Sequence, residues 1–301
     1  MKKILITGSH GYLGRNISKT LSKKTFKIYG IGNGNWSKNS YKKWGFDYLI
    51  NGEVSFKNLL RHFKKLDYII HCAGSGKVGL PYKEDLKKNV NSVKSILEFI
   101  KKSNHKSKLI YLSSYSVYGD GYKSQIKESS KTNPVSNYAR NKKKAENLCL
   151  NYSNKYNFDL LILRVASIYG EGLEKQFIHD ACQKISNIKN TFNGSGEEKR
   201  DFIHISDMCK IVSFFVKKSF KSNNIINCGS GRGQKIKTVL NALLKNLKID
   251  IKPIFNKVGL KDNPKNLIVN INKLKTLGIT PKKNFNLGIK QYVSWYKKNK
   301  K

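Results

Sequence analysis

Tyr138 and Lys142 stand four residues apart in the segment 136–156, which has Pro134 just before it and is predicted to be a long helix. Residues four apart lie on the same face of a helix. A phenol with a pKa near 10 is a poor base at neutral pH, but a fixed ammonium one turn away favours its phenolate form. The pair could therefore take and return a proton. Because Tyr-x-x-x-Lys also arises by chance in a chain rich in both residues, the assignment depends on its surroundings.

A serine-rich stretch, 112–119, follows the predicted strand 108–113 directly. Open α/β sheets bind ligands at the carboxyl ends of their strands. Ser114 lies 24 residues before the tyrosine, and its hydroxyl could hydrogen-bond a sugar oxygen and steady the charge that develops during proton transfer. For Ser113 and Ser116, a turn hydroxyl that satisfies local backbone is an equal alternative. The predicted catalytic residues are Ser114, Tyr138 and Lys142.

A glycine-rich loop connects the predicted strand 3–7 to the predicted helix 13–23. Gly8 permits a tight turn, Gly11 lets the backbone approach a pyrophosphate, and Gly14 lets helix and strand pack closely. The amino end of the helix then faces the anion. The spacing is GxxGxxG, and we predict a dinucleotide site whose loop residues are Gly8, His10, Gly11, Tyr12, Leu13 and Gly14.

The second predicted strand, 26–31, continues into Gly32-Asn33-Gly34 and has no acid at its end. An acid at that point normally binds the adenosine ribose. Asn33 can still bind a hydroxyl and does not repel a 2′-phosphate, which Lys38 could reach. The sequence therefore leaves both NAD and NADP open, and the segment could also be a plain glycine-rich loop.

Short β-branched runs alternate with longer helical patterns from the amino terminus to about Gly170. This alternation predicts an α/β fold, a Rossmann-type doubly wound parallel sheet with crossover helices on both faces. Beyond Gly170 the rhythm changes, which indicates a smaller α/β C-terminal substrate domain. The other predicted strands are 46–50, 66–72, 158–165 and 225–228. The other predicted helices are 56–63, 85–102, 175–186, 206–218, 237–245 and 287–296.

The chain has 301 residues and a formal net charge of +40, with 59 Lys and Arg against 19 Asp and Glu. Only six of the basic residues are Arg. The lysines are spread along the whole chain and form no basic motif of a known nucleic-acid reader, so we expect solvated surface lysines and no nucleic-acid partner. The charge could still attract a substrate that carries phosphates.

The five Cys lie at positions 72, 149, 182, 209 and 228. Their spacing is not that of metal ligands, and their number is odd. Neither a zinc site nor a disulfide framework is expected. No apolar run is long enough for a membrane span, and the amino terminus lacks the apolar region of a signal peptide. The cytoplasm is the expected compartment.

Together these motifs resemble the extended short-chain dehydrogenase/reductases of the nucleotide-sugar epimerase/dehydratase type. The resemblance runs almost end to end and is carried by the conjunction of motifs. They are the TGxxGxxG start, His71-Cys-Ala-Gly74, the SSxxVYG stretch, the YxxxK pair, Leu163-Arg-Val-Ala-Ser-Ile-Tyr-Gly170 and Gly196-Glu-Glu-Lys-Arg-Asp-Phe-Ile-His204.

The resemblance implies roles position by position. Tyr138 would be the acid/base, Lys142 its helper and Ser114 the third catalytic residue. Tyr138 and Lys142 are also predicted cofactor-binding residues, and the lysine could hold the nicotinamide ribose. Ala73 and Gly74 would lie against the adenosine half of the cofactor. Arg200 would clamp the nucleotide-sugar diphosphate, which suits a guanidinium. Asp201 and His204 would be structural and hold their loop on the Rossmann core, whereas the substrate-binding residues would be Ser114, Ser116, Ser167 and Arg200.

Two departures from the family pattern stand out. Related 4,6-dehydratases carry an Asp-Glu pair where this chain has Tyr115 and Ser116, which disfavours dehydration. Ser167 replaces an Asn that many relatives have before the Tyr-Gly step, so the substrate geometry could differ. The segment 261–264 resembles a substrate-side loop of sugar-nucleotide reductases, although a solvated loop is an equal alternative.

The resemblance implies an NAD(P)-dependent oxidoreductase in polysaccharide biosynthesis that acts at hexose C4 of a nucleotide sugar. The expected activity is that of a 4-keto sugar reductase. A 4-epimerase that retains NAD and a catalytically silent cofactor sensor are the alternatives. The expected domains are 1–166 with about 203–228 for the cofactor, and about 167–202 with 229–301 for the substrate. A homodimer through the helices near 85–102 and 136–156 is expected, with Ile96, Phe99 and Leu148 either at the interface or inside the subunit.

Overall fold

The computed structural model describes residues 1–21, 25–34, 36–37, 39–76, 79–103, 107–221, 224–259 and 264–299. The predicted roles of Lys38 and of residues 261–263 lie outside these ranges. The chain forms two compact units. Unit 1 contains Met1–Ser114, Asn137–Arg164 and Cys209–Ile226, and unit 2 contains Tyr115–Ser136, Val165–Met208 and Asn227–Lys301. The division differs from the predicted domains mainly at 115–136, which belong to unit 2.

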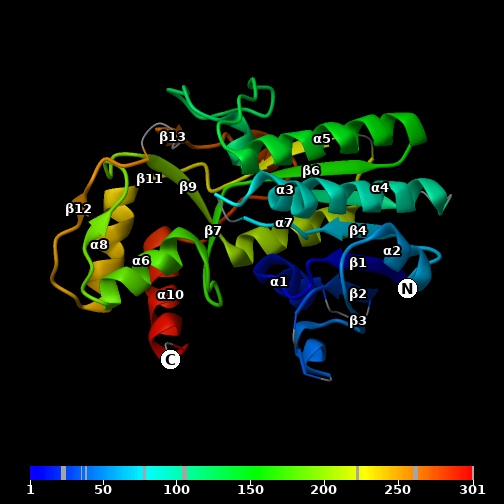
Figure 1. Ribbon diagram of the computed structural model, residues 1–301, viewed down its shortest axis with the longest axis horizontal. Coiled ribbons are helices and arrows are strands. Elements are labelled where there is room, and N and C mark those ends of the chain that lie inside the picture. The colour runs from blue at the N-terminus through cyan, green and yellow to red at the C-terminus, as the bar shows by residue number, and fades with distance from the viewer. Residues whose placement is uncertain are drawn as a thin grey trace. The chain divides into compact units, whose positions relative to one another are not determined.

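A seven-stranded sheet organises unit 1, with the strand order β10-β6-β5-β4-β1-β2-β3 (Figure 1). β1 pairs in parallel with both β2 and β4, so the strand order changes direction between β1 and β4. β2–β3 and β4–β5 are parallel as well, which confirms the predicted Rossmann-type sheet. Its strands are β1 (Lys2–Thr7), β2 (Phe26–Gly32), β3 (Tyr48–Asn51), β4 (Tyr68–His71), β5 (Lys108–Ser114), β6 (Leu160–Val165) and β10 (Asn224–Cys228).

The central strands form because both of their faces are buried. Ile4, Leu5 and Ile6 are fully buried in succession, as in a parallel sheet covered on two sides. The helices of this unit are α1 (Tyr12–Leu21), α2 (Phe56–His62), α3 (Tyr82–Leu86), α4 (Ser92–Lys102), α5 (Asn137–Tyr156) and most of α7 (Ile205–Lys218), and η1 (Ser40–Trp44) is a single 3-10 turn. Among these described residues, no helix is long and apolar enough to cross a membrane.

α4 and α5 run side by side and pack against the sheet (Figure 1). Ile96 and Phe99 on α4 are fully buried in this core, together with Cys149 on α5. Leu148 is partly buried against the same cluster. Ile96 and Phe99 therefore stabilise the subunit itself and offer no surface for the predicted dimer contact.

The segment predicted as one helix over 85–102 consists of α3, a π-helical turn (η2, Lys87–Asn91) and α4. The turn places Asn89 in a buried position, where its Nδ2 donates to Asp85 Oδ1 at 3.1 Å and to the Ser75 carbonyl at 3.2 Å. The wider turn thus serves a polar network and breaks the regular helical repeat.

A smaller sheet organises unit 2 around β9, which pairs in parallel with β7 and β13 and antiparallel with β11. β8 and β12 form a separate parallel pair. The strands are β7 (Ser167–Tyr169), β8 (Thr191–Phe192), β9 (Lys199–His204), β11 (Gly233–Lys235), β12 (Ile254–Phe255) and β13 (Asn266–Leu267). The helices are η3 (Tyr115–Tyr118), α6 (Gln176–Ser186), α8 (Ile236–Leu247), α9 (Asn272–Thr276) and α10 (Phe285–Asn299).

Buried Asp201 holds part of unit 2 together. Its carboxylate accepts hydrogen bonds from the backbone N–H of Ser230 at 2.7 Å, of Gly231 at 3.0 Å and of Val269 at 3.4 Å, and from the Ser230 hydroxyl at 2.7 Å. These partners all lie in unit 2. Asp201 therefore ties its own strand to neighbouring segments of the same unit.

Candidate active site

The glycine loop between β1 and α1 has the geometry of a diphosphate cradle. Gly8 has φ +66°, and a Cβ there would lie 2.8 Å from the backbone nitrogen of Ala73. A Cβ on Gly14 would lie 2.4 Å from the Gly8 carbonyl oxygen, and the N–H of Gly11 donates to that same oxygen at 2.9 Å. The first turn of α1 carries no acid. The loop thus fits a dinucleotide diphosphate at the amino end of α1.

Ala73 and Gly74 follow β4 and are held beside this loop. Thr7 Oγ1 accepts the Ala73 N–H at 3.1 Å and shares a 2.8 Å hydrogen bond with His71 Nδ1. Burial lowers the pKa of His71 to about 3, so its ring is neutral and serves as a hydrogen-bonding link between β1 and β4. A Cβ on Gly74 would lie 2.6 Å from Asn89 Oδ1, so the loop after β4 requires glycine there.

The segment just beyond the carboxyl end of β2 is only partly covered by the rest of the unit. Asn33 is exposed just beyond the strand. The His10 ring lies 4.4 Å from the Trp36 ring and fills the space in which a Cβ on Gly34 would stand. Tyr12 and Leu13 are partly buried at the start of α1. His10 thus packs onto the segment after β2.

Lys142 is buried on α5 and reaches the carboxyl end of β5. Its Nζ donates to the Leu112 carbonyl at 2.9 Å and lies 5.0 Å from the centre of the Tyr111 ring. Ser114 is buried two residues further along β5, and Tyr138 is half-buried in the first turn of α5. All three predicted catalytic residues therefore lie in unit 1, and the lysine is anchored to the strand that carries the serine.

Glu146 lies one turn beyond Lys142 on α5 and is not among the site residues predicted from the sequence. Its buried carboxylate accepts hydrogen bonds from Ser113 Oγ at 2.7 Å and from Arg164 Nε and Nη2 at 3.0 and 2.8 Å. Arg164 lies on β6, so the cluster joins α5 to β5 and β6. The signal was present in the sequence, because the i+4 spacing of Tyr138 and Lys142 continues to Glu146.

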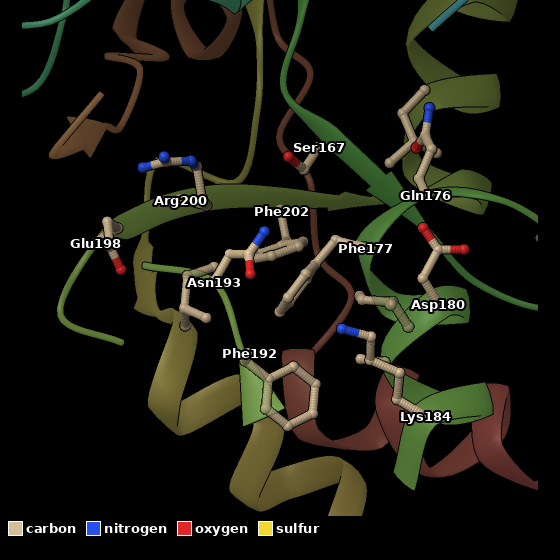
Figure 2. A pocket seen from close by; sticks show the side chains of 14 residues that line it. Ser167, Gln176, Phe177, Asp180, Lys184, Phe192, Asn193, Glu198, Arg200 and Phe202 are labelled. Carbon is tan, nitrogen blue, oxygen red and sulfur yellow. The ribbon is translucent and has the colours of Figure 1, made fainter. Parts of the chain in front are cut away.

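Unit 2 contains a cavity of about 370 Å³ whose wall includes Ser167 and Arg200. Figure 2 shows these two side chains at one end, and Lys184 of α6 with Phe192 of β8 at the other. Arg200 lies on β9 and is nine-tenths buried, and its Nη1 donates to the Lys199 carbonyl at 2.8 Å. A buried guanidinium in a cavity wall is suited to binding an anionic group such as a diphosphate.

Tyr115 and Ser167, the residues at the two positions that depart from the family pattern, contact each other. The Tyr115 and Ser167 hydroxyls share a 2.7 Å hydrogen bond, and burial raises the pKa of Tyr115, which keeps the phenol neutral. Ser116 is partly buried next to Tyr115 in η3. The two replacements therefore contact each other directly through their hydroxyls.

The known proteins to which this chain is similar include epimerases and dehydratases. A model of the "NAD dependent epimerase/dehydratase family" matches residues 4–229. ADP-L-glycero-D-manno-heptose-6-epimerase of Brachyspira hyodysenteriae is 28% identical and covers 98% of this chain and 98% of its own. dTDP-D-glucose 4,6-dehydratase of Dictyostelium discoideum is 28% identical over 76% of this chain and 58% of its own.

A solved structure of UDP-glucose 4-epimerase from Thermotoga maritima, determined with UDP-glucose, has the same fold. Its TM-score is 0.89 at 21% identity, with coverage of 99% of this chain and 100% of that one. The family match spans both the glycine loop and the Tyr138–Lys142 pair. This chain therefore belongs to the NAD-dependent epimerase/dehydratase family.

Proposed function

We propose that the protein is an NAD(P)-dependent oxidoreductase that acts at hexose C4 of a nucleotide sugar, with reduction of a 4-keto sugar as its principal reaction. One observation carries the proposal. The glycine cradle, Ser114 and the Lys142 ammonium all belong to unit 1 and gather at the carboxyl ends of β1 and β5. That combination suits hydride chemistry coupled to proton transfer at a carbonyl.

In the proposed mechanism, a bound nicotinamide cofactor supplies the hydride that C4 receives. Tyr138 donates its phenolic proton to the sugar oxygen, so the carbonyl becomes an alcohol. Ser114 donates a hydrogen bond to the same oxygen, and Lys142 lowers the cost of the phenolate left on Tyr138. In the reverse direction Tyr138 takes the hydroxyl proton as hydride leaves carbon.

The cavity of unit 2 would hold the nucleotide end of the substrate, with Arg200 on its diphosphate. We also infer that the protein does not dehydrate its substrate. Residues 115 and 116 are Tyr and Ser where the related 4,6-dehydratases have carboxylates, so these positions supply no acid or base for removing water from the sugar. The Dictyostelium relative carries the dehydratase name, so this inference needs its own measurement.

A 4-epimerase is the second candidate. The likeness to the UDP-glucose 4-epimerase structure favours it, whereas the Brachyspira relative is named as an epimerase at position 6 of a heptose. An epimerase retains its cofactor through the cycle, whereas the exposed Asn33 and the missing acid after β2 favour a cofactor that exchanges. We therefore place the reductase first.

Two experiments test the proposal. The first is mass analysis of the small molecules that co-purify with the protein, and the second is incubation of the protein with 4-keto and 4-hydroxy nucleotide sugars. A reductase consumes one NAD(P)H for each 4-keto sugar. An epimerase interconverts 4-hydroxy epimers without net consumption of cofactor, and a dehydratase yields a product lighter by one water. Turnover of no nucleotide sugar with either cofactor would contradict the proposed function.

We infer that Lys142 also holds the nicotinamide ribose, so the pH dependence of cofactor binding should report the charge of Lys142. Burial lowers its pKa from the usual 10.5 to about 8, while Glu146 and Asp85 limit the fall. The ammonium is therefore lost at a lower pH than in free lysine. We expect NAD(H) affinity, measured by calorimetry, to decline as pH rises through about 8. Lys142→Met should bind weakly with no such decline, and wild-type affinity that stays constant to pH 10 would contradict the assignment.

A further inference from the structure

Asn193 lines the unit 2 cavity and is hydrogen-bonded to Asn256, and both side chains are exposed in this structure. The parallel pairing of β8 with β12 continues past both strands, because the Asn256 N–H donates to the Phe192 carbonyl at 3.1 Å and the Gly194 N–H donates to the Val258 carbonyl at 3.0 Å. These backbone bonds flank both asparagines. The backbone that carries the two side chains is therefore held in place by hydrogen bonds between the two segments.

A backbone donor fixes the direction of both amides. The Val258 N–H donates to the side chain of Asn256 at 3.0 Å, and only the Oδ1 end of that amide can accept it. Nδ2 of Asn256 then donates to Asn193 Oδ1 at 3.0 Å. An amide orientation is often ambiguous, but a chain of bonds that starts at a backbone N–H allows one arrangement. Asn193 must therefore point its Nδ2 away from Asn256.

Asn193 lines the cavity, and Figure 2 shows its amide directed into it between Arg200 and Phe192. With a diphosphate on Arg200, the base of the same nucleotide would extend toward Asn193, Phe192 and Phe177. The phenylalanine rings offer apolar faces for a planar base. The edge of a base that differs between nucleotides lies opposite the ribose, so this edge would reach the β8–β12 segment.

We propose that Asn193 is a specificity-determining residue that reads the base as a hydrogen-bond donor and selects a keto base (uracil, thymine or guanine) over cytosine and adenine. This inference rests on the proposed function, in which the cavity holds the nucleotide end of the substrate. A carbonyl on the base accepts from Nδ2. An amino group in the same place faces a second donor and leaves both unpaired.

UDP and CDP test the inference as a matched pair, because they differ only at the carbonyl or amino edge of the base. Because the Asn193 side chain is exposed in this structure, loss of its hydrogen bond to the base should lower affinity by about 2- to 12-fold, the range for an ordinary hydrogen bond. We expect calorimetry on the whole protein to show UDP binding tighter than CDP by a ratio in that range. GDP and ADP repeat the comparison for purines and show whether the cavity also admits the larger base.

Variants of Asn193 and Asn256 distinguish the amide that donates to the base from the amide that orients it. Asn193→Asp replaces the donor by an acceptor and should reverse the UDP:CDP ratio; its added charge affects both ligands equally and cancels. Asn256→Asp offers Asn193 an acceptor in place of a donor, so Asn193 should turn its Nδ2 toward residue 256 and its Oδ1 toward the base, and the ratio should fall to one or below. Asn190→Ala is the matched control, because that amide lies on the same segment, bonds the Lys252 carbonyl at 3.1 Å and should leave the ratio unchanged.

The outcomes distinguish this inference from the proposed function. Equal affinity of the wild type for UDP and CDP, or an Asn193→Asp variant that still prefers UDP, would overturn the base-reading role while nucleotide binding stands. Failure to bind any of the four nucleoside diphosphates would overturn both. Arg200→Met should weaken UDP and CDP by the same factor, because the diphosphate is common to them.

Discussion

Replacing Tyr138 by Phe should lower turnover by about 10²- to 10⁴-fold, the range for loss of a positioned general acid/base. Phenylalanine keeps the ring that packs at the start of α5 and removes only the hydroxyl. The free energy of unfolding should therefore change little, and UDP affinity should stay as in the wild type, because the proposed nucleotide cavity belongs to unit 2. Steady-state kinetics with the nucleotide sugar that the incubation test identifies measures the effect.

Tyr152→Phe is the matched control for this variant. It removes a phenol from the same helix, but one that bonds Glu98 and has its pKa raised to about 12 by that carboxylate. Its turnover should equal that of the wild type. If Tyr138→Phe also turns over at nearly the wild-type rate, Tyr138 is not the acid/base.

The sequence predicts the elements of unit 1 well because their pattern is physically simple. The strand predicted at 3–7 is observed as Lys2–Thr7, and the helix predicted at 136–156 as Asn137–Tyr156. Uninterrupted apolar runs leave few alternatives to a buried parallel strand. The π-helical turn at Lys87–Asn91 was missed, because it depends on the buried bonds of Asn89 and not on any repeat in the sequence.

Unit 2 was harder to predict. Several of its strands have only two or three residues, too short to show an alternating pattern, and β9 was noticed only as a family motif. The wall of its cavity depends on residues distant in sequence, such as Asn193 and Asn256, which come together through β8 and β12. The two departures at 115 and 167 are visible in the sequence, but only the structure shows that their hydroxyls share a bond.

Removal of the Glu146 carboxylate should be the most destabilising of the single changes considered. Glu146 and Arg164 are almost completely buried, and loss of one partner leaves the other charge without compensation. Breaking such a pair costs about 3–5 kcal/mol. We expect Glu146→Ala to lose that much free energy of unfolding in urea. Glu84→Gln, which breaks an exposed pair with Lys88, should lose less than about 1 kcal/mol.

The double variant Glu146→Leu with Arg164→Met separates stability from positioning. Replacement of a buried ion pair by apolar residues of similar volume is often neutral or stabilising, so most of the lost free energy should return. Turnover should not return with it, because Ser113, the neighbour of Ser114 on β5, loses its acceptor, and the Lys142 bond to the Leu112 carbonyl then has to hold α5 to the end of β5 without it. Glu146 also raises the pKa of Lys142, so the fall in cofactor affinity should begin below pH 8 in this variant. A double variant that is stable, fully active and unchanged in its pH profile would show that the cluster supports folding alone.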